Sequence, residues 1–299
     1  MNVIVFGGSG FLGSHVADVL TDRGHKVTIF DKVVSPYLRK EQEMIVGDVL
    51  EEKAVREAVK GADFVYNFIA IADIDDACQR PVETAQINVL GTIHILEACR
   101  AERVKRFIFS SSIYVYSDAG SFYRSSKQSC ELFIENYQKM YGLDYTILRY
   151  GSLYGPRSDE RNWVYKILKQ ALIEKKITRE GNGEEIREYV HVIDAAKLSV
   201  DILKDENKNR RLIITGSEQI KIKDLLTMIK EMLKNDVTIE FYKPTRESEH
   251  YEVTPYVFNP QIAVKIRGQE HLDMGQGILN ILGEIHNKYV LQRVTALKK

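Results

Sequence analysis

The sequence predicts an α/β protein with a doubly wound parallel sheet, and three observations support this fold class. Short apolar segments alternate with longer amphipathic segments through the first half of the chain. Within the apolar segments, apolar and polar residues do not alternate as they would in a sheet with one exposed face. This pattern indicates strands that helices cover on both faces. A glycine-rich turn joins the first apolar segment to the first amphipathic one. Repetition of strand, helix and strand implies right-handed crossovers and therefore parallel strands.

Six short apolar segments are predicted strands, and the segments between them carry helical spacing. Leu12, Val16 and Leu20 fall on one helix face, and Gly24 provides a stop. Between the fourth and fifth strands, Val82–Ala101 is long enough to cross a sheet face. The predicted strands are Val3–Phe6, Lys26–Phe30, Met44–Val46, Phe64–Phe68, Arg106–Ser110 and Tyr145–Leu148.

The pattern changes after Gly151, which predicts two domains. Helical segments continue at Trp163–Lys175 and Ile222–Lys234, but strands become fewer and turn residues more frequent. We expect residues 1–151 to form the larger domain. Residues 152–299 should form a smaller lobe, with some segments returning to the first domain.

Composition excludes several classes of protein. Lys plus Arg and Asp plus Glu each number 42, so the basic excess typical of nucleic-acid binding is missing. Three cysteines without a C-x-x-C pair argue against a disulfide framework and a zinc ribbon. No apolar run has the length of a membrane span, and the first residues read as a strand rather than a targeting segment. We expect a cytoplasmic protein with no bound metal.

The glycine-rich turn predicts a dinucleotide site. Gly7, Gly10 and Gly13 follow the first strand and open the first helix, so a pyrophosphate could approach the backbone at the helix N-terminus. Asp31 ends the second strand, where an acid accepts hydrogen bonds from ribose hydroxyls and repels a 2′-phosphate. Asp31 therefore favours NAD over NADP, although the neighbouring Lys32 could tolerate a phosphate.

Asp48 follows the third strand and has two interpretations. It could bond the adenine amino group at the carboxyl edge of the sheet, or it could cap the helix that begins near Glu51. One residue can do both.

A serine, a tyrosine and a lysine form a candidate catalytic set. The fifth strand ends in three serines, of which Ser112 is the last, and Tyr123 and Lys127 lie one turn apart on the next helix. An ammonium near a phenol lowers the pKa of that phenol, which makes tyrosinate accessible near neutrality. Together the three side chains could take the proton of a secondary alcohol while its hydride leaves for a nicotinamide.

A cluster of acids follows the fourth strand. Asp73, Asp75 and Asp76 lie on the side where substrate would bind. A metal site or auxiliary base is conceivable, but acids ahead of a helix are usually solvated or capping groups.

The first 200 residues resemble the extended short-chain dehydrogenase/reductase superfamily, in its NAD-dependent epimerase/dehydratase branch that acts on nucleotide sugars. Besides the glycine turn, the matching segments are Asn88–Thr92, Phe107–Ser112, Arg149–Arg157 and Arg187–Asp194. The resemblance implies a Rossmann-type NAD domain followed by a nucleotide-sugar lobe. It also implies a homodimer or higher homo-oligomer paired through the helices at residues 82–101 and 123–141.

The resemblance also assigns roles to single residues. Ser112 would be the catalytic hydroxyl, Tyr123 the base and Lys127 its activator, while Asn88 would order the site near the nicotinamide ribose. Arg187 would hold the substrate diphosphate, with Ser152 and Arg246 as further substrate-binding candidates. The NAD groove would consist of Gly7, Gly10, Phe11, Leu12, Gly13, Asp31, Lys32, Asp48, Val49, Phe68, Ala70, Asn88, Tyr123 and Lys127.

Three departures from the family pattern bear on the reaction. Ile113 and Tyr114 replace the acid pair with which dehydratases expel water, so a 4,6-dehydratase is not expected. The connection from Ser112 to Tyr123 is much shorter than usual, which predicts a more open sugar pocket. Ser152 replaces a frequent asparagine that touches the substrate phosphates.

We expect an NAD-dependent enzyme of carbohydrate biosynthesis that oxidises a ring hydroxyl, at C4, of a nucleoside-diphosphate sugar. UDP and GDP sugars are both admissible. Return of the hydrogen to the other face of the keto sugar makes the enzyme a 4-epimerase. Release of the 4-keto sugar, for example from a GDP-heptose, makes it a net 4-dehydrogenase whose bound NADH a second substrate reoxidises. A minor alternative is a non-catalytic dinucleotide-sensing protein.

The helix at residues 123–141, which is the second of the expected dimer interface, carries two sets of apolar side chains. Cys130, Phe133, Ile134 and Tyr137 share a stripe that we expect to face the parent sheet. Leu132 and Met140 lie off that stripe and are candidates for a subunit contact.

Overall fold

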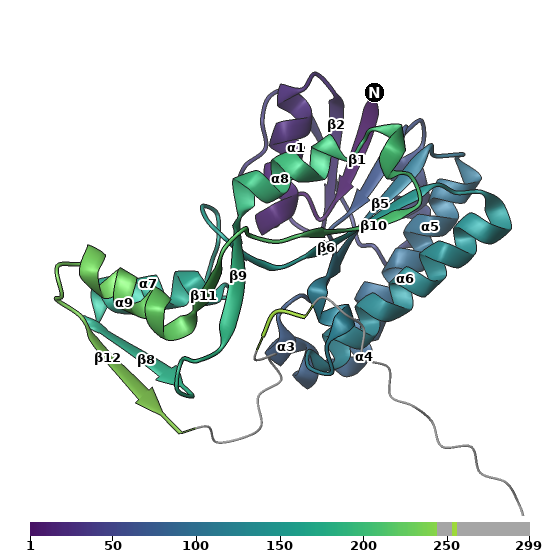
Figure 1. The fold of residues 1–299 in the computed structure, drawn as a ribbon. Helices are drawn as coiled ribbons and strands as arrows, with labels where there is room; N and C mark the ends of the chain where they lie inside the picture. Colours follow the sequence, from purple (N-terminus) through teal and green to yellow (C-terminus); the bar gives the residue numbers. More distant parts are fainter. Residues whose placement is uncertain (244–252, 256–299) are drawn as a thin grey trace, which may run out of the picture. The chain divides into compact units, whose positions relative to one another are not determined.

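Seven parallel strands form the main sheet of the computed structural model, which describes residues 1–243 and 253–255 (Figure 1). The strand order β10–β6–β5–β4–β1–β2–β3 is that of a doubly wound sheet, so the predicted Rossmann-type fold is confirmed. The six predicted strands are present, with ends within two residues of those expected. The seven strands are β1 (Asn2–Phe6), β2 (Lys26–Asp31), β3 (Gln42–Val46), β4 (Phe64–Asn67), β5 (Arg106–Ser112), β6 (Tyr145–Tyr150) and β10 (Arg210–Ile214).

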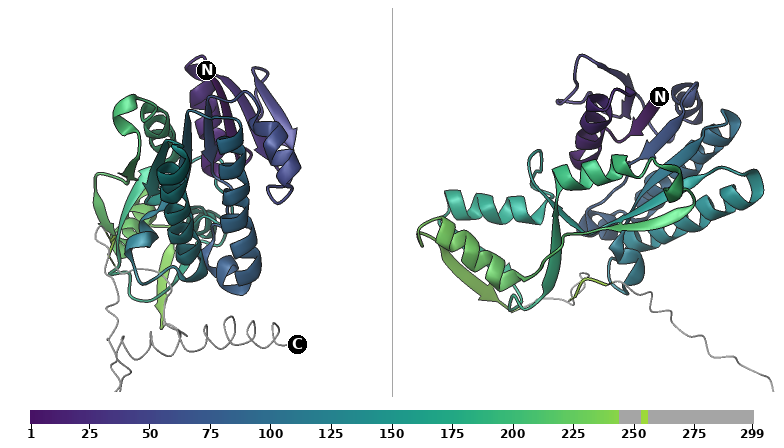
Figure 2. Two further views of the ribbon diagram at one scale, coloured as in Figure 1. Left: turned by 90° about the vertical axis from the view of Figure 1, so that its right-hand side faces the viewer. Right: turned by 45° about the horizontal axis from the view of Figure 1, so that its top comes forward.

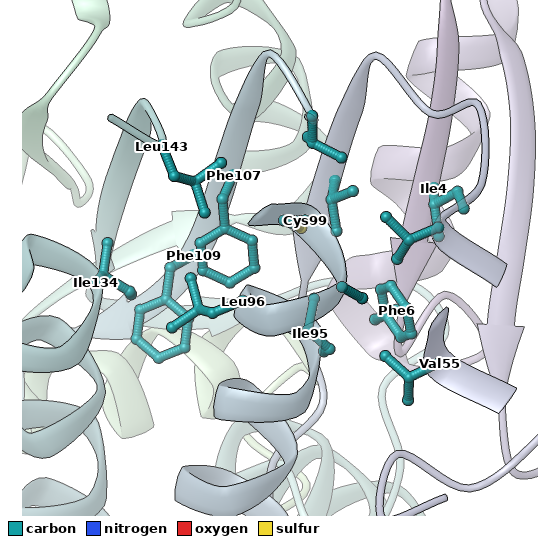
Figure 3. Close-up of a cluster of buried hydrophobic side chains, with 14 of the residues drawn as sticks. Ile4, Phe6, Val55, Ile95, Leu96, Cys99, Phe107, Phe109, Ile134 and Leu143 are labelled. Atoms are coloured by element: carbon teal, nitrogen blue, oxygen red, sulfur yellow. The ribbon is translucent and has the colours of Figure 1, made fainter. Parts of the chain in front are cut away.

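Helices cover both faces of this sheet, because its strands carry apolar side chains on both sides. Helices α1 (Phe11–Asp22) and α8 (Val192–Asp201) pack together on one face. On the other face lie α2 (Glu52–Val59), α5 (Gly91–Ala101) and α6 (Ser121–Tyr141). Figure 3 shows the core beneath this second group, with Phe6, Phe107 and Phe109 from the strands against Ile95 and Leu96 of α5.

The predicted crossover helix at residues 82–101 is helical throughout but is not one α-helix. A short α4 (Pro81–Thr84) leads into a π-helical turn, η1 (Ala85–Leu90), which continues into α5. A shorter helix, α3 (Ile74–Gln79), precedes α4. Such π-turns often occur at functional sites, and this one carries Asn88.

The inner face of α6 differs from the prediction at one position. Cys130, Ile134 and Tyr137 are buried as expected, but Phe133 is 40% exposed, so the prediction was wrong for Phe133. The buried arc of the helix is centred toward Lys127, and Phe133 lies at its edge. Leu132 is exposed as expected. Whether another subunit covers this surface stays a prediction.

The second half of the chain forms two small sheets and, between their strands, returns once to the large sheet. The sheet β11–β9–β7 and the pair β12–β8 pack with two helices around a separate core (Figure 2). After β9 the chain rejoins the main sheet through α8 and β10, and it then adds β11 and β12 to the small sheets. The division at residue 151 stays a prediction, because residues 244–252 and 256–299 lie outside the described part. The elements are β7 (Ser152–Tyr154), α7 (Trp163–Ile173), β8 (Lys176–Glu180), β9 (Ile186–His191), β11 (Gln219–Lys221), α9 (Ile222–Met232) and β12 (Thr238–Tyr242).

Two short 3₁₀ turns complete the description, η2 (Ile113–Tyr116) after β5 and η3 (Asp205–Asn207) before β10. None of the helices in the described ranges combines the length and apolar character that a membrane crossing requires.

Candidate active site

A cavity of about 600 Å³ lies at the carboxyl ends of the central strands, where ligands bind in open α/β sheets. Its wall joins the glycine turn, the loop after β4, the end of β5, the first turn of α6 and residues of the second half. The predicted site residues that line it are Gly7, Gly10, Phe11, Leu12, Gly13, Phe68, Ala70, Ser112, Tyr123, Ser152 and Arg187.

The glycine turn fits a bound pyrophosphate. Gly7 has a φ of +78°, and a Cβ at Gly13 would lie 2.2 Å from the carbonyl oxygen of Gly7. Side chains are therefore excluded where the backbone folds tightly onto the start of α1. The helix also begins without a side-chain cap and without an acid in its first turn. Its positive end thus stays available to an anion from the cavity.

The acids beyond this turn are held by the backbone. The carboxylate of Asp31 accepts a hydrogen bond from the Ser9 amide at 3.0 Å, which fixes the acid beside the glycine turn. Lys32 pairs with Asp48 at 2.9 Å, so its ammonium is engaged away from Asp31. Asp48 also accepts from the Leu50 amide at 3.0 Å. That bond, followed by the Lys32 contact, lowers the pKa of Asp48.

The contacts of Asp48 support the helix-capping interpretation only in part. It closes the turn that leads to α2, but the N-cap position itself is Glu51, which makes no side-chain cap. Val49 is buried in the core, where it contacts Gly91. Neither Asp48 nor Val49 is among the residues that line the cavity.

Each of the three serines at the end of β5 is hydrogen-bonded to a residue in a different turn of α6. The Ser110 carbonyl accepts a hydrogen bond from Lys127 Nζ at 2.6 Å. The Ser111 hydroxyl donates to the Glu131 carboxylate at 2.5 Å. The hydroxyl groups of Ser112 and Tyr123 are hydrogen-bonded to each other. Because the helix residues lie at i, i+4 and i+8, one helix face meets one strand end in a single register.

Burial sets the electrostatics of this set. It raises the pKa of Tyr123 to about 12, against a smaller lowering by the Ser112 bond. Burial lowers the pKa of Lys127 to about 8, against smaller raising effects of Cys130 and Glu131. The ammonium lies 5.7 Å from the centre of the Tyr123 ring.

The ammonium of Lys127 bonds the Ser110 carbonyl rather than the phenol. Loss of water around the phenolate outweighs the lowering effect of the Ser112 bond on the Tyr123 pKa. The lowering of that pKa by Lys127 stays a prediction.

Asn88 orders the site without lining the cavity. Its side-chain oxygen accepts from the Ile71 amide at 2.8 Å, and its amide donates to Ser126 Oγ at 2.9 Å. Ser126 in turn donates to the Tyr123 carbonyl at 2.7 Å. The π-turn thus ties the loop after β4 to the first turns of α6.

Tyr114 lies in the short connection that was expected to leave the sugar pocket more open, and it forms part of the cavity wall. Its ring meets the Tyr123 ring edge-on at 6.4 Å, and Tyr114 lines the cavity. Gly120, with a φ of +96°, makes room for it, because a Cβ there would lie 2.6 Å from the Tyr114 ring. This role was not predicted from the sequence, where its only signal is a bulky residue and a glycine within an unusually short connection.

Charged residues line the outer part of the cavity. Asp73 caps α3 by accepting from the Asp76 amide at 3.0 Å, which supports the capping interpretation, and both acids line the cavity. Arg187 is 7% exposed. Arg179, which the sequence analysis missed, pairs with Glu185 at 3.0 Å. Arg246 lies outside the described residues.

A doubly wound sheet with a glycine turn and a Ser–Tyr–Lys set at its carboxyl edge is the arrangement of an NAD-dependent short-chain dehydrogenase/reductase. The chain belongs to the NAD dependent epimerase/dehydratase family, whose model matches residues 3–214.

Known proteins similar to this chain act on nucleotide sugars. A protein from Methanocaldococcus jannaschii, provisionally named UDP-glucose 4-epimerase, is 28% identical over 95% of this chain and 98% of its own. A UDP-N-acetyl-alpha-D-glucosaminuronate decarboxylase from Bacillus cytotoxicus is 29% identical over 73% and 75%. The crystal structure of Thermotoga maritima UDP-glucose 4-epimerase with UDP-glucose aligns with a TM-score of 0.79 and 25% identity, over 86% of this chain and 90% of that one.

The contacts of Asp31 predict a test of cofactor choice. Asp31→Asn keeps an acceptor for the Ser9 amide but removes the charge that repels a 2′-phosphate. We expect the ratio of NAD to NADP affinity to fall by about tenfold, which titration of both cofactors would measure. Lys32→Met is the control, because Lys32 is engaged with Asp48, and it should leave the ratio unchanged. An unchanged ratio in Asp31→Asn would place the ribose elsewhere.

Proposed function

We propose that the protein oxidises a ring hydroxyl, at C4, of a nucleoside-diphosphate sugar and acts as a 4-epimerase with NAD. The observation that carries this proposal is one cavity lined by the Ser112–Tyr123 hydroxyl pair, the glycine turn and Arg187. A proton acceptor, a dinucleotide site and a phosphate-binding cation thus share a single space. The 4-epimerases among the similar proteins support this reaction.

Residues of the first half would hold the cofactor. The glycine turn and the open end of α1 suit its pyrophosphate, and Asp31 suits the adenosine ribose. Bound NAD supplies the acceptor and later the donor of the hydrogen carried by the sugar carbon. The hydroxyl-lined end of the cavity is left for the sugar.

Ser112 and Tyr123 would handle the proton of the sugar hydroxyl. Their mutual hydrogen bond places two hydroxyl oxygens side by side, so a sugar oxygen that joins them can bond Ser112 while its proton passes to Tyr123. At pH 7, below its pKa of about 8, Lys127 is mostly an ammonium. That positive charge favours the phenolate over the neutral phenol, although burial opposes it.

Arg187 would bind the diphosphate. The side chain is almost completely buried, so its charge is little screened and a phosphate in the cavity gains a strong contact. Arg179 adds a second cation to the same wall. Two guanidinium groups suit the two charges of a diphosphate.

The Tyr114 wall favours epimerisation over net dehydrogenation. An epimerase must retain its keto sugar while the sugar turns over, and an aromatic ring packed beside Tyr123 serves that purpose. A net 4-dehydrogenase must release the keto sugar and reoxidise its cofactor. One of the similar proteins is a decarboxylase, so the relatives of this chain do not all catalyse one reaction.

Replacing the candidate base provides the first test. Tyr123→Phe should keep the fold and NAD but lower kcat by roughly 10²- to 10⁴-fold, since only the proton acceptor is lost. Turnover of UDP-glucose and of GDP-mannose to their C4 epimers would be followed by chromatography. Tyr137→Phe is the matched control on α6, where the hydroxyl bonds Glu97, and it should retain activity. Retained turnover in Tyr123→Phe would require another base.

Replacing Arg187 tests the diphosphate site. A charge-assisted bond to phosphate contributes about 1.5–3 kcal/mol, so Arg187→Ala should raise the dissociation constant of the nucleotide sugar roughly ten- to a hundredfold. NAD affinity should stay the same, and calorimetry would measure both. Arg56→Ala, on α2, is the control. Loss of NAD binding in Arg187→Ala would place this arginine in the cofactor groove.

A further inference from the structure

The middle serine of β5 leads to a buried ion pair that the proposed reaction does not use. Ser111 donates a hydrogen bond to the Glu131 carboxylate. The same carboxylate accepts two hydrogen bonds from Arg149, one from Nε at 3.0 Å and one from a terminal nitrogen at 2.5 Å. Arg149 also donates to the Tyr116 hydroxyl and lies over its ring, 4.6 Å from the centre. The side chains of Glu131 and Arg149 are 7% and 13% exposed.

This pair joins the elements that carry the candidate catalytic set. Glu131 belongs to α6 with Tyr123 and Lys127, and Ser111 precedes Ser112 on β5. Arg149 belongs to β6, the neighbour of β5 in the sheet, and registers with Ser111 itself. Displacing Glu131 would therefore free α6 from the strand end one turn beyond the Lys127 contact.

Stability alone does not account for such a pair. Burying two charges costs desolvation that their attraction only partly offsets, and apolar replacements of buried pairs are often neutral or stabilising. The cost is compensated if the pair also acts on neighbouring groups.

The group next to the pair is Lys127. On its own helix it faces Tyr123, Cys130 and the Glu131 carboxylate. From β5 it faces the Ser110 carbonyl and the Phe109 ring, whose centre is 4.7 Å away. On β6, Arg149 carries the positive charge that pairs with Glu131. Within the described residues, Glu131 is the one carboxylate among these neighbours.

We propose that Glu131 is a positioning residue that holds α6 in register with the end of β5 and stabilises the Lys127 ammonium against burial, with Arg149 fixing its carboxylate. The effect on turnover rests on the proposed function. The effect on Lys127 does not, so the two can fail separately.

The direct test is the titration of Lys127 in the full-length protein. Lysines labelled with ¹³C at Cε are followed by NMR against pH, and the Lys127 signal is assigned by its loss in Lys127→Arg. In the wild type it should titrate near 8. Glu131→Gln keeps an acceptor for Ser111 but removes the negative charge and leaves Arg149 uncompensated. Its Lys127 should titrate about one unit lower, because an ammonium without its anion loses its proton more readily.

Two variants separate this effect from general damage. Glu131→Gln/Arg149→Met also removes the uncompensated guanidinium and should keep most of the shift, because the loss of the Glu131 anion causes it. Glu135→Gln, one turn further along α6, breaks the matched pair with Arg211 and should leave the titration of Lys127 unchanged. An unshifted Lys127 in folded Glu131→Gln, or an equal shift in Glu135→Gln, would overturn the proposal.

Ser111→Ala keeps the proposal testable if Glu131→Gln does not fold. It removes only the bond between the strand end and Glu131. With UDP-galactose as the probe, kcat should fall about tenfold at unchanged KM, since the set loses alignment but the nucleotide site is intact. Unchanged kcat would contradict the positioning role. Absence of turnover in the wild type would count against the proposed function, while the Lys127 titration would still decide this inference.

Discussion

The register between the last three residues of β5 and one face of α6 is the constraint on which the site depends. Three successive serines bond three helix residues spaced four apart, and the helix group differs at each bond: an ammonium, a carboxylate and a phenol. A shift of one residue along the strand would exchange the partners and turn the Ser112 hydroxyl away from Tyr123. The sheet beneath, the π-turn at Asn88 and the Glu131–Arg149 pair all serve to hold this register.

Burial gives the site its chemical character. Lys127 is buried and Tyr123 is partly buried, and each is thereby pushed toward its neutral form. The charged forms of the two side chains therefore depend on stabilising neighbours. Ser112 stabilises the phenolate of Tyr123, and Ser110 together with Glu131 stabilises the ammonium of Lys127. Elsewhere the wall of the cavity carries charge, with Arg179 and Arg187, which suits the neutral sugar and the anionic diphosphate of the proposed substrate.

Local sequence predicted most of the sheet and the candidate catalytic set, because both follow from spacing along the chain. Apolar runs without alternation marked the strands, and Ser112, Tyr123 and Lys127 do lie together. What failed depends on distant partners. Phe133 shares the period of the buried stripe but lies at the edge of the arc that meets the sheet. The wall made by Tyr114 requires the room that Gly120 leaves, and the Glu131–Arg149 pair joins residues 18 positions apart. The net direction of the Tyr123 pKa depends on burial, which spacing does not reveal.

In the proposed reaction, this cavity removes a hydrogen from C4 of a nucleotide sugar and returns it to the same carbon. The reaction can be followed by NMR of the products when the protein and NAD are incubated with UDP-galactose deuterated at C4, and with the matching GDP sugar. We expect the C4 epimer of one of these sugars with its deuterium retained, because the hydrogen never exchanges with water. An epimer carrying protium at C4, or two sugars left unchanged, would contradict it.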